Sequence, residues 1–144
     1  MKARRPTPLG RIKLLMQSGV TVAVASGRRS AALTARMREL GVRHVAQGCA
    51  DKVRALLTVT RRLGIEPLEA ACLVDDTPDL PLMATVGFAG AVADAHPLVH
   101  AAAHWVSTAP GGTGAVRELC DALLRARSTL GATCWGFGSS PSSP

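Results

Sequence analysis

Three carboxylates follow one short apolar run: Asp75, Asp76 and Asp79 come directly after the sequence AACLV at residues 70–74. Carboxylates this close repel one another, so a nearby cation must offset their charge. One of them can bind Mg²⁺, which prefers hard oxygen ligands, while another supports it or anchors a lysine. The competing interpretation is that Asp76 and Asp79 cap the next helix, whose N-terminus favours negative charge. The motif alone does not separate the two.

A second polar group follows an earlier apolar run. Ser26, Gly27 and Arg28 offer a hydroxyl, a flexible backbone and a guanidinium at the start of a predicted helix, which together can cradle an anion. An ordinary turn between a strand and a helix explains the same residues. Lys52 opens a later helix, and Arg36 lies about two helical turns beyond Arg28, where it can reach the same site. For both, a solvent-exposed helix surface is the competing interpretation.

The composition favours a small anionic ligand over nucleic acid or a membrane. The formal net charge is +7, and 14 of the 17 basic residues are Arg, which suits bidentate binding of phosphate or carboxylate. These residues are scattered without interleaved aromatic side chains, which argues against nucleic acid. No apolar stretch approaches the ~20 residues of a membrane span, and the start of the sequence lacks the apolar part of a signal peptide, so we expect a cytoplasmic protein. Neither the four cysteines nor the four histidines have the spacing of a metal site.

The polar groups are positioned by alternating strands and helices. Short apolar runs predict strands at residues 20–26, 43–48, 70–74, 87–93 and 104–108. Helical spacing of apolar residues predicts helices at residues 30–40, 51–63, 80–85, 96–103 and from about 114 onward. Strands that are apolar throughout indicate a parallel sheet with helices on both faces, an α/β fold. The carboxyl ends of such strands share one rim, where Ser26 and Asp75 are expected to meet.

The order of these motifs resembles the haloacid dehalogenase superfamily of phosphatases, in which Ser or Thr, Lys and an Asp-Asp-x-x-Asp motif follow one another in this way. The resemblance extends to the 3-deoxy-D-manno-octulosonate 8-phosphate phosphatase branch, an enzyme family of lipopolysaccharide biosynthesis. It covers residues from about 9 to 127 and is carried by the segments ASGRRSAAL, GVRHVAQGCADK, VDDTPDLPLM, AVADAHPLV and GGTGAVRELCD. It implies a Rossmann-like fold and a Mg²⁺-dependent hydrolase of phosphate monoesters.

The resemblance also implies a role for each candidate residue. Asp75 would be the Mg²⁺ ligand, and Asp76 and Asp79 would support it. Ser26 would hydrogen-bond the transferring phosphoryl group, and Lys52 would neutralise charge on it.

Further residues would bind the rest of the substrate. Arg28, Arg36 and Lys13 would grip an anionic sugar acid. Family members are tetramers, so the resemblance implies a homo-oligomer, with the glycine loop at residues 111–114 near the mouth of the site.

The sequence departs from the family at its nucleophile, which is an Asp in an Asp-x-Asp-Gly motif at the end of the central strand. The printed sequence has no such motif, and Glu39 is the only acidic residue before Asp51. We therefore expect phosphate release no faster than background. The absent strand would lie between the strands at 20–26 and 70–74, so those two strands either pair directly or enclose a cavity.

The departure leaves several interpretations of the chain. Residues 1–127 are expected to form an N-terminally incomplete phosphatase core, and residues 128–144, rich in Gly, Ser and Pro, a disordered tail. The chain is then a truncated or misread phosphatase, or a short non-catalytic paralogue that binds a sugar phosphate or forms oligomers. A third alternative is the phosphatase-like domain found on acylneuraminate cytidylyltransferases.

Overall fold

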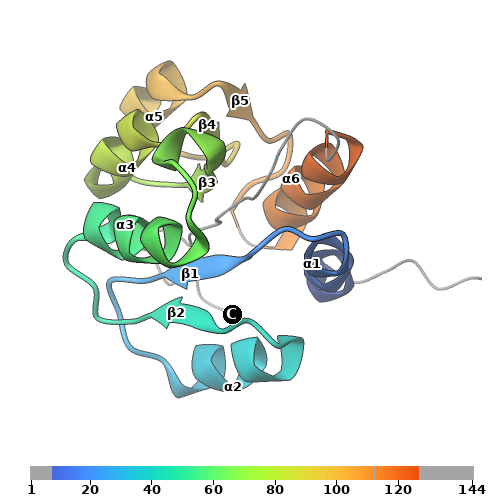
Figure 1. The fold of residues 1–144 in the computed structure, drawn as a ribbon. Coiled ribbons are helices and arrows are strands. Elements are labelled where there is room, and N and C mark those ends of the chain that lie inside the picture. The colour runs from blue at the N-terminus through green and yellow to red at the C-terminus, as the bar shows by residue number, and fades with distance from the viewer. Residues whose placement is uncertain (1–7, 112, 127–144) are drawn as a thin grey trace, which may run out of the picture.

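The protein has an α/β fold built from short parallel strands and helices (Figure 1). The structure is a computed structural model, and it describes residues 8–111 and 113–126. The predicted tail at 128–144 therefore lies outside the described residues. In chain order the elements are α1 (Pro8–Gln17), β1 (Ala23–Ala25), α2 (Ala31–Leu40), β2 (His44–Ala46), α3 (Lys52–Leu63), η1 (Pro67–Glu69), β3 (Ala71–Val74), η2 (Thr77–Asp79), α4 (Leu80–Thr85), β4 (Phe88–Ala91), α5 (Pro97–Ala102), β5 (Trp105–Val106) and α6 (Thr113–Arg125).

Local signals set the ends of two central helices. Ser30 precedes α2 and Asp51 precedes α3, and each side chain accepts a hydrogen bond from a backbone N–H in the first turn of its helix. Both helices end at a glycine in the left-handed conformation, Gly41 with φ 78° and Gly64 with φ 70°. These signals agree with the helices predicted at residues 30–40 and 51–63.

The strands form two separate parallel sheets. β1 pairs with β2, and β3, β4 and β5 form a three-stranded sheet in that order. Figure 1 shows β1 between β2 and β3, so the division falls in the middle of the strand layer. The prediction of parallel strands is confirmed. Direct pairing of β1 with β3, one of the two expected consequences of the absent strand, does not occur.

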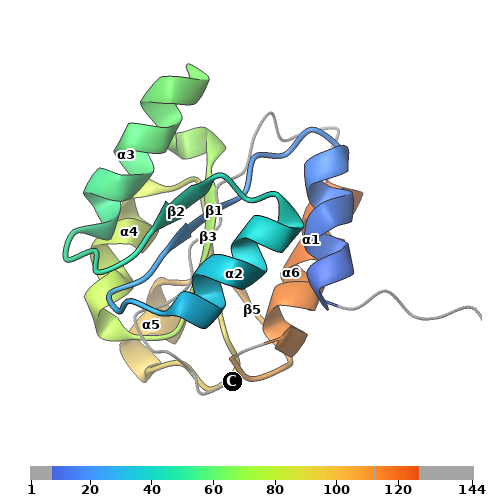
Figure 2. The ribbon, with the colours of Figure 1, turned by 90° about the horizontal axis from the view of Figure 1, so that it is seen from below.

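Helices cover both faces of the strand layer. Figures 1 and 2 show α1 and α6 on one side, and α3, α4 and α5 on the other. β3 is buried at every residue because both layers cover it. The apolar stripe predicted for α6 also faces the interior, with Val116, Leu119, Cys120 and Leu123 buried.

The sequence patterns did not predict α1, which is a partner of α6. Ile12 and Leu15 of α1 are buried, and the two helices lie side by side (Figure 2). Arg11 Nη1 forms an ion pair with Asp121 Oδ1 of α6 at 3.1 Å. α1 leads directly into β1, so the α1–α6 pair connects the C-terminal helix to the two-stranded sheet.

Two buried cysteines are expected to be chemically inert. Burial raises the pKa of the Cys72 and Cys120 thiols to about 12, so almost no reactive thiolate is present near neutral pH. At pH 8, iodoacetamide should therefore modify the partly exposed Cys49 while leaving Cys72 and Cys120 unmodified in the native protein. Peptide mass mapping measures this, with the urea-unfolded protein as the control in which all three react. Equal rates at Cys49 and Cys72 in the native protein would contradict the burial of β3.

Within the described part of the chain, no helix combines the length and the apolar character that crossing a bilayer requires.

Candidate functional site

The rim of the site begins where β1 ends. The backbone N–H of Ser26 donates to Ala46 O at 2.8 Å, which continues the ladder with β2. The Ser26 carbonyl accepts from Cys49 N at 2.9 Å, which ties this turn to the segment that leads into α3. Arg28 N donates to Ser26 Oγ at 3.2 Å. Because the Ser26 hydroxyl acts there as an acceptor, its own proton remains available for an anion.

A buried ion pair joins the start of α3 to the segment after β3. Lys52 is the first residue of α3, and its Nζ lies 2.7 Å from Asp79 Oδ1. Both side chains are buried, with 8% and 0% of their surface exposed. The prediction that a carboxylate of the acidic motif anchors a lysine is therefore confirmed, and Asp79 is that carboxylate.

The third component is Asp75, which directly follows β3 and is half-buried. Within the described residues, its Oδ1 and the Oδ2 of Asp79 are buried without a hydrogen-bond partner. Burial raises the pKa of Asp75, the Asp79 carboxylate raises it further, and Lys52 acts in the opposite direction. A carboxylate oxygen that is buried, unpaired and disfavoured in its charged form is a suitable ligand for a hard cation such as Mg²⁺.

Asp76 has a different role from its two neighbours. It is exposed, and its Oδ1 accepts from Thr77 N at 2.7 Å, which caps η2. The helix-capping interpretation therefore applies to Asp76, whereas Asp79 makes no side-chain capping bond. In the described part of the chain, no three His, Cys, Asp or Glu side chains form a ligand group. The carboxylates that fit a metal are Asp75 and, behind it, Asp79.

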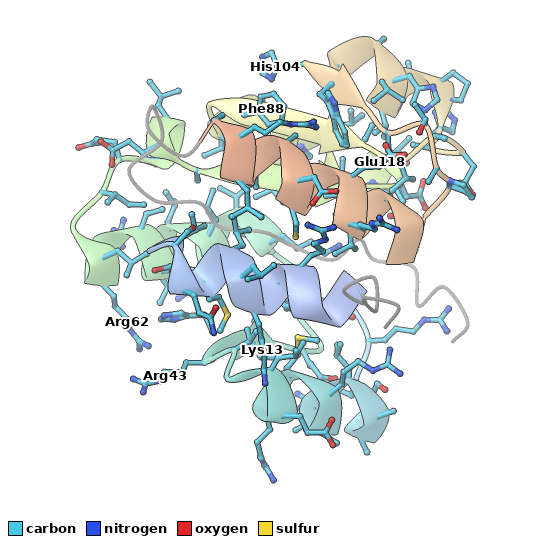
Figure 3. The ribbon with its side chains drawn as sticks, turned by 90° about the vertical axis from the view of Figure 1, so that its right-hand side faces the viewer. Lys13, Arg43, Arg62, Phe88, His104 and Glu118 are labelled. Carbon is cyan, nitrogen blue, oxygen red and sulfur yellow. The ribbon has the colours of Figure 1, made fainter. Side chains whose placement is uncertain are left out.

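The predicted substrate-binding residues are placed in two different regions. Arg28 follows the Ser26 turn and Arg36 lies on α2; both are exposed, and in the described residues neither forms an ion pair. Lys13 is exposed in the middle of α1, and Figure 3 shows its side chain extending from that helix in the direction of α2. Within the described residues, no hydrogen bond or ion pair joins Lys13 to Ser26, Lys52 or Asp75.

Sequence reasoning missed a polar cluster that holds the loop after β5. Glu118 of α6 accepts hydrogen bonds from Ser107 Oγ at 3.0 Å, from Thr108 N at 2.8 Å and from the Thr108 hydroxyl. These donors hold the pKa of Glu118 below its usual range. Asp94 Oδ1 accepts from Gly111 N at 2.8 Å and fixes the other end of the loop. No spacing rule could have found this cluster, because its members come from separate elements.

Three of the four histidines make structural contacts. His104 Nδ1 accepts from Ala89 N at 2.9 Å, and its ring stacks on Phe88 with centroids 6.2 Å apart (Figure 3). His96 caps α5, and His100 Nε2 lies 2.9 Å from Val92 O.

Comparison with known proteins identifies the family of this chain. The sequence model of the haloacid dehalogenase-like hydrolase family matches residues 43–119. The chain is 45% identical over 123 residues to the 3-deoxy-D-manno-octulosonate 8-phosphate phosphatase KdsC of Yersinia pestis. The aligned region covers 85% of this chain and 66% of that protein. For KdsC of Escherichia coli strain K12 the identity is 40% over 119 residues, covering 83% of this chain and 63% of that protein.

A solved structure gives the same result. The crystal structure of 3-deoxy-D-manno-octulosonate 8-phosphate phosphatase from Moraxella catarrhalis, in complex with magnesium ion, phosphate ion and KDO, superposes with a TM-score of 0.80 at 38% identity. The match covers 88% of this chain and 72% of that one. The chain spans less than two thirds of the length of the two KdsC sequences. It belongs to the haloacid dehalogenase-like hydrolases and, within them, to the 3-deoxy-D-manno-octulosonate 8-phosphate phosphatase family.

Proposed function

We propose that this chain carries the phosphate- and Mg²⁺-binding part of a phosphomonoester hydrolase of the 3-deoxy-D-manno-octulosonate 8-phosphate phosphatase type. The observation that carries the proposal is the buried Lys52–Asp79 pair, 2.7 Å long, together with the Asp75 carboxylate oxygen that is buried and has no hydrogen-bond partner within the described residues. The Moraxella catarrhalis relative, which was crystallised with magnesium ion, phosphate ion and KDO, supports the choice of ligands.

The anion-binding groups are a hydroxyl and an ammonium. The Ser26 hydroxyl donates its proton to a phosphoryl oxygen. Lys52 uses one of its three N–H donors on Asp79, and the others neutralise charge on the bound group. The exposed guanidinium groups of Arg28 and Arg36 bind the carboxylate of a sugar acid, for which their planar donor arrangement is suited.

The metal-binding groups are the carboxylates of Asp75 and Asp79, each of which has one buried oxygen without a hydrogen-bond partner in the described residues. Asp75 holds Mg²⁺ directly, and Asp79 supports it while fixing Lys52. When bound, Mg²⁺ supplies positive charge that offsets the charge of the phosphoryl group. Asp75 then faces a cation, which removes the electrostatic cost of its burial.

We further propose that the chain, as printed, binds its ligand without hydrolysing it. A phosphatase of this family needs an aspartate nucleophile, and the sequence contains no Asp-x-Asp-Gly motif. Neither Asp75 nor Asp79 replaces it, because one is assigned to the metal and the other is paired with Lys52. Both interpretations of the chain, as part of a phosphatase or as a binding module, are compatible with binding without hydrolysis.

We also propose, by family resemblance, that the chain forms a homo-oligomer, a tetramer. Light scattering tests this.

The test is calorimetric titration with Mg²⁺, alone and with 3-deoxy-D-manno-octulosonate 8-phosphate. Asp75→Asn is expected to lower Mg²⁺ affinity by about 10- to 100-fold, because it removes the charged ligand without changing its shape. Its fold should be intact, since the pKa of Asp75 is raised and its charge contributes no stability at neutral pH. The matched control, Asp76→Asn, removes an exposed cap and should bind Mg²⁺ normally.

Two outcomes would contradict the proposal. Equal Mg²⁺ affinity in the Asp75→Asn and Asp76→Asn variants would exclude the assigned metal ligand. Release of phosphate above background that disappears in Asp75→Asn would show that the chain turns over without the missing motif.

A further inference from the structure

The turn at residues 26–30 is bound by the chain that follows β2. The Ser26 carbonyl accepts from Cys49 N at 2.9 Å, and the Arg28 carbonyl accepts from Gly48 N at 3.2 Å. These bonds come after the last paired residues of β1 and β2, so the contact between the two strands continues beyond their ends. The backbone of the turn is therefore held at the two residues proposed to bind the anion.

The side chain of Gln47 joins the same turn to helix α2. Gln47 is half-buried, its Oε1 accepts from Ser30 N at 2.5 Å, and its Nε2 donates to Thr34 Oγ1 at 2.5 Å. The Thr34 hydroxyl donates in turn to Ser30 O at 3.1 Å. One amide group thus connects both backbone groups of Ser30, directly and through Thr34, to the end of β2.

The bond to Ser30 N is of a kind that helices often make locally. Ser30 is the N-cap of α2, and its hydroxyl accepts from Leu33 N at 3.2 Å. In a capping box, a Glu or Gln side chain at the position of Leu33 would accept from the N-cap N–H in return. Leucine has no acceptor, and Gln47 supplies one from another element, 17 residues away. The start of α2 is therefore fixed relative to β2 as well as capped.

The residue after Gln47 adds a packing contact. Gly48 has a φ of +63°, and a Cβ there would lie 2.9 Å from Arg29 Nε. The Arg29 side chain thus lies against the backbone of Gly48, while the adjacent Arg28 is exposed. Residues 47–49 therefore contact the turn along most of its length.

We propose that Gln47 is a positioning residue for anion binding, which keeps the turn at residues 26–30 in the conformation that presents Ser26 and Arg28 to the ligand. The inference rests on the proposed function, because that function assigns these two residues to a sugar phosphate. A turn that is already ordered loses less conformational entropy when the ligand binds, so the ligand is bound more tightly. Gln47 provides this order through its bond to Ser30.

The test compares two variants that both weaken the start of α2. Gln47→Met keeps the length of the side chain and removes both of its hydrogen bonds. The matched control, Ser30→Ala, removes the N-cap side chain and leaves the backbone N–H that Gln47 binds. Both should lower the midpoint of urea unfolding, whereas only Gln47→Met releases the turn from the end of β2.

Calorimetric titration with 3-deoxy-D-manno-octulosonate 8-phosphate in the presence of Mg²⁺ measures the effect on binding. We expect Gln47→Met to weaken binding by about tenfold and Ser30→Ala by less than about twofold. Titration with Mg²⁺ alone should give the wild-type affinity for both variants, because Asp75 follows β3, which belongs to the other sheet. General destabilisation would not produce a loss confined to the anion.

Hydrogen exchange tests the turn without any ligand. In Gln47→Met the amides of Gly48 and Cys49, which donate to carbonyls of the turn, should exchange several-fold faster than in the wild type. In Ser30→Ala the same two amides should exchange at the wild-type rate.

Three results would overturn the inference. Wild-type affinity for the sugar phosphate in Gln47→Met would show that the amide does not position the turn. Equal losses of affinity in Gln47→Met and Ser30→Ala would show that capping of α2 alone accounts for the effect. Unchanged exchange at Gly48 and Cys49 in Gln47→Met would show that the turn keeps its conformation without the amide. A wild-type chain that binds no sugar phosphate would instead contradict the proposed function, and with it any role of Gln47 in binding.

Discussion

Lys52→Met is expected to lower the free energy of unfolding by about 3–5 kcal/mol, the range for breaking a buried ion pair by removing one partner. The Lys52 ammonium lies 2.7 Å from Asp79 Oδ1, and the Asp79 side chain is fully buried. Without Lys52, Asp79 keeps two buried oxygens and loses the cation that compensates its charge. Methionine has a similar length and packs without charge, so the loss reports the charge alone. Urea unfolding followed by circular dichroism measures it.

Two further variants separate the ion pair from other effects. Lys13→Met makes the same substitution at an exposed site and should change the free energy of unfolding by no more than about 0.5 kcal/mol. Adding Asp79→Leu to Lys52→Met removes the uncompensated carboxylate and should recover much of the loss. If Lys52→Met is no more destabilising than Lys13→Met, the buried pair does not hold the rim together.

Gly87→Ala is expected to cost about 3 kcal/mol, because there is no room for a side chain where η1 meets β4. A Cβ at Gly87 would lie 1.9 Å from the carbonyl oxygen and 2.9 Å from the carbonyl carbon of Leu68, and these backbone atoms cannot move aside as a flexible side chain can. Gly87 N also donates to Ala70 O at 3.1 Å, so a displacement would strain the start of the β3–β4 ladder. The loss appears as a lower midpoint in urea.

The control for this clash is a glycine with open surroundings. At Gly64 a Cβ would meet nothing within 4 Å, but its φ of 70° disfavours any other residue. Gly64→Ala should therefore cost only about 1–2 kcal/mol, from backbone strain. If Gly87→Ala costs no more than Gly64→Ala, then η1 and β4 do not approach as closely as the structure has them.

The elements whose signals are local could be predicted from the sequence. Asp51 caps α3 through an N–H three residues later, and Gly41 ends α2 by adopting a left-handed conformation; both depend only on neighbouring residues. The alternation of apolar strands with helices indicated a parallel sheet, and the expectation that Ser26 and Asp75 share one rim followed from it. The motifs were specific enough to indicate the family correctly.

The features that depend on contacts between distant residues required the tertiary structure. Helix α1 is held by α6, about a hundred residues later in the chain. Asp76 and Asp79 have different roles, as a helix cap and as the partner of Lys52. This difference depends on a contact between Asp79 and Lys52, which lie 27 residues apart in the sequence. Lys13 could be assigned to the substrate only by resemblance, and the structure places it, exposed, in the middle of α1 (Figure 3).

The arrangement of the sheet shows the same limit. The sequence by itself determined that the strands are parallel and apolar, because the composition of a strand reflects how many of its faces are buried. It did not determine that β1 and β3 do not pair with each other, since a strand's partner is chosen by hydrogen bonds to residues far along the chain. Only the tertiary structure decided this, because the partner of each strand depends on how the helices that cover the strand layer position it.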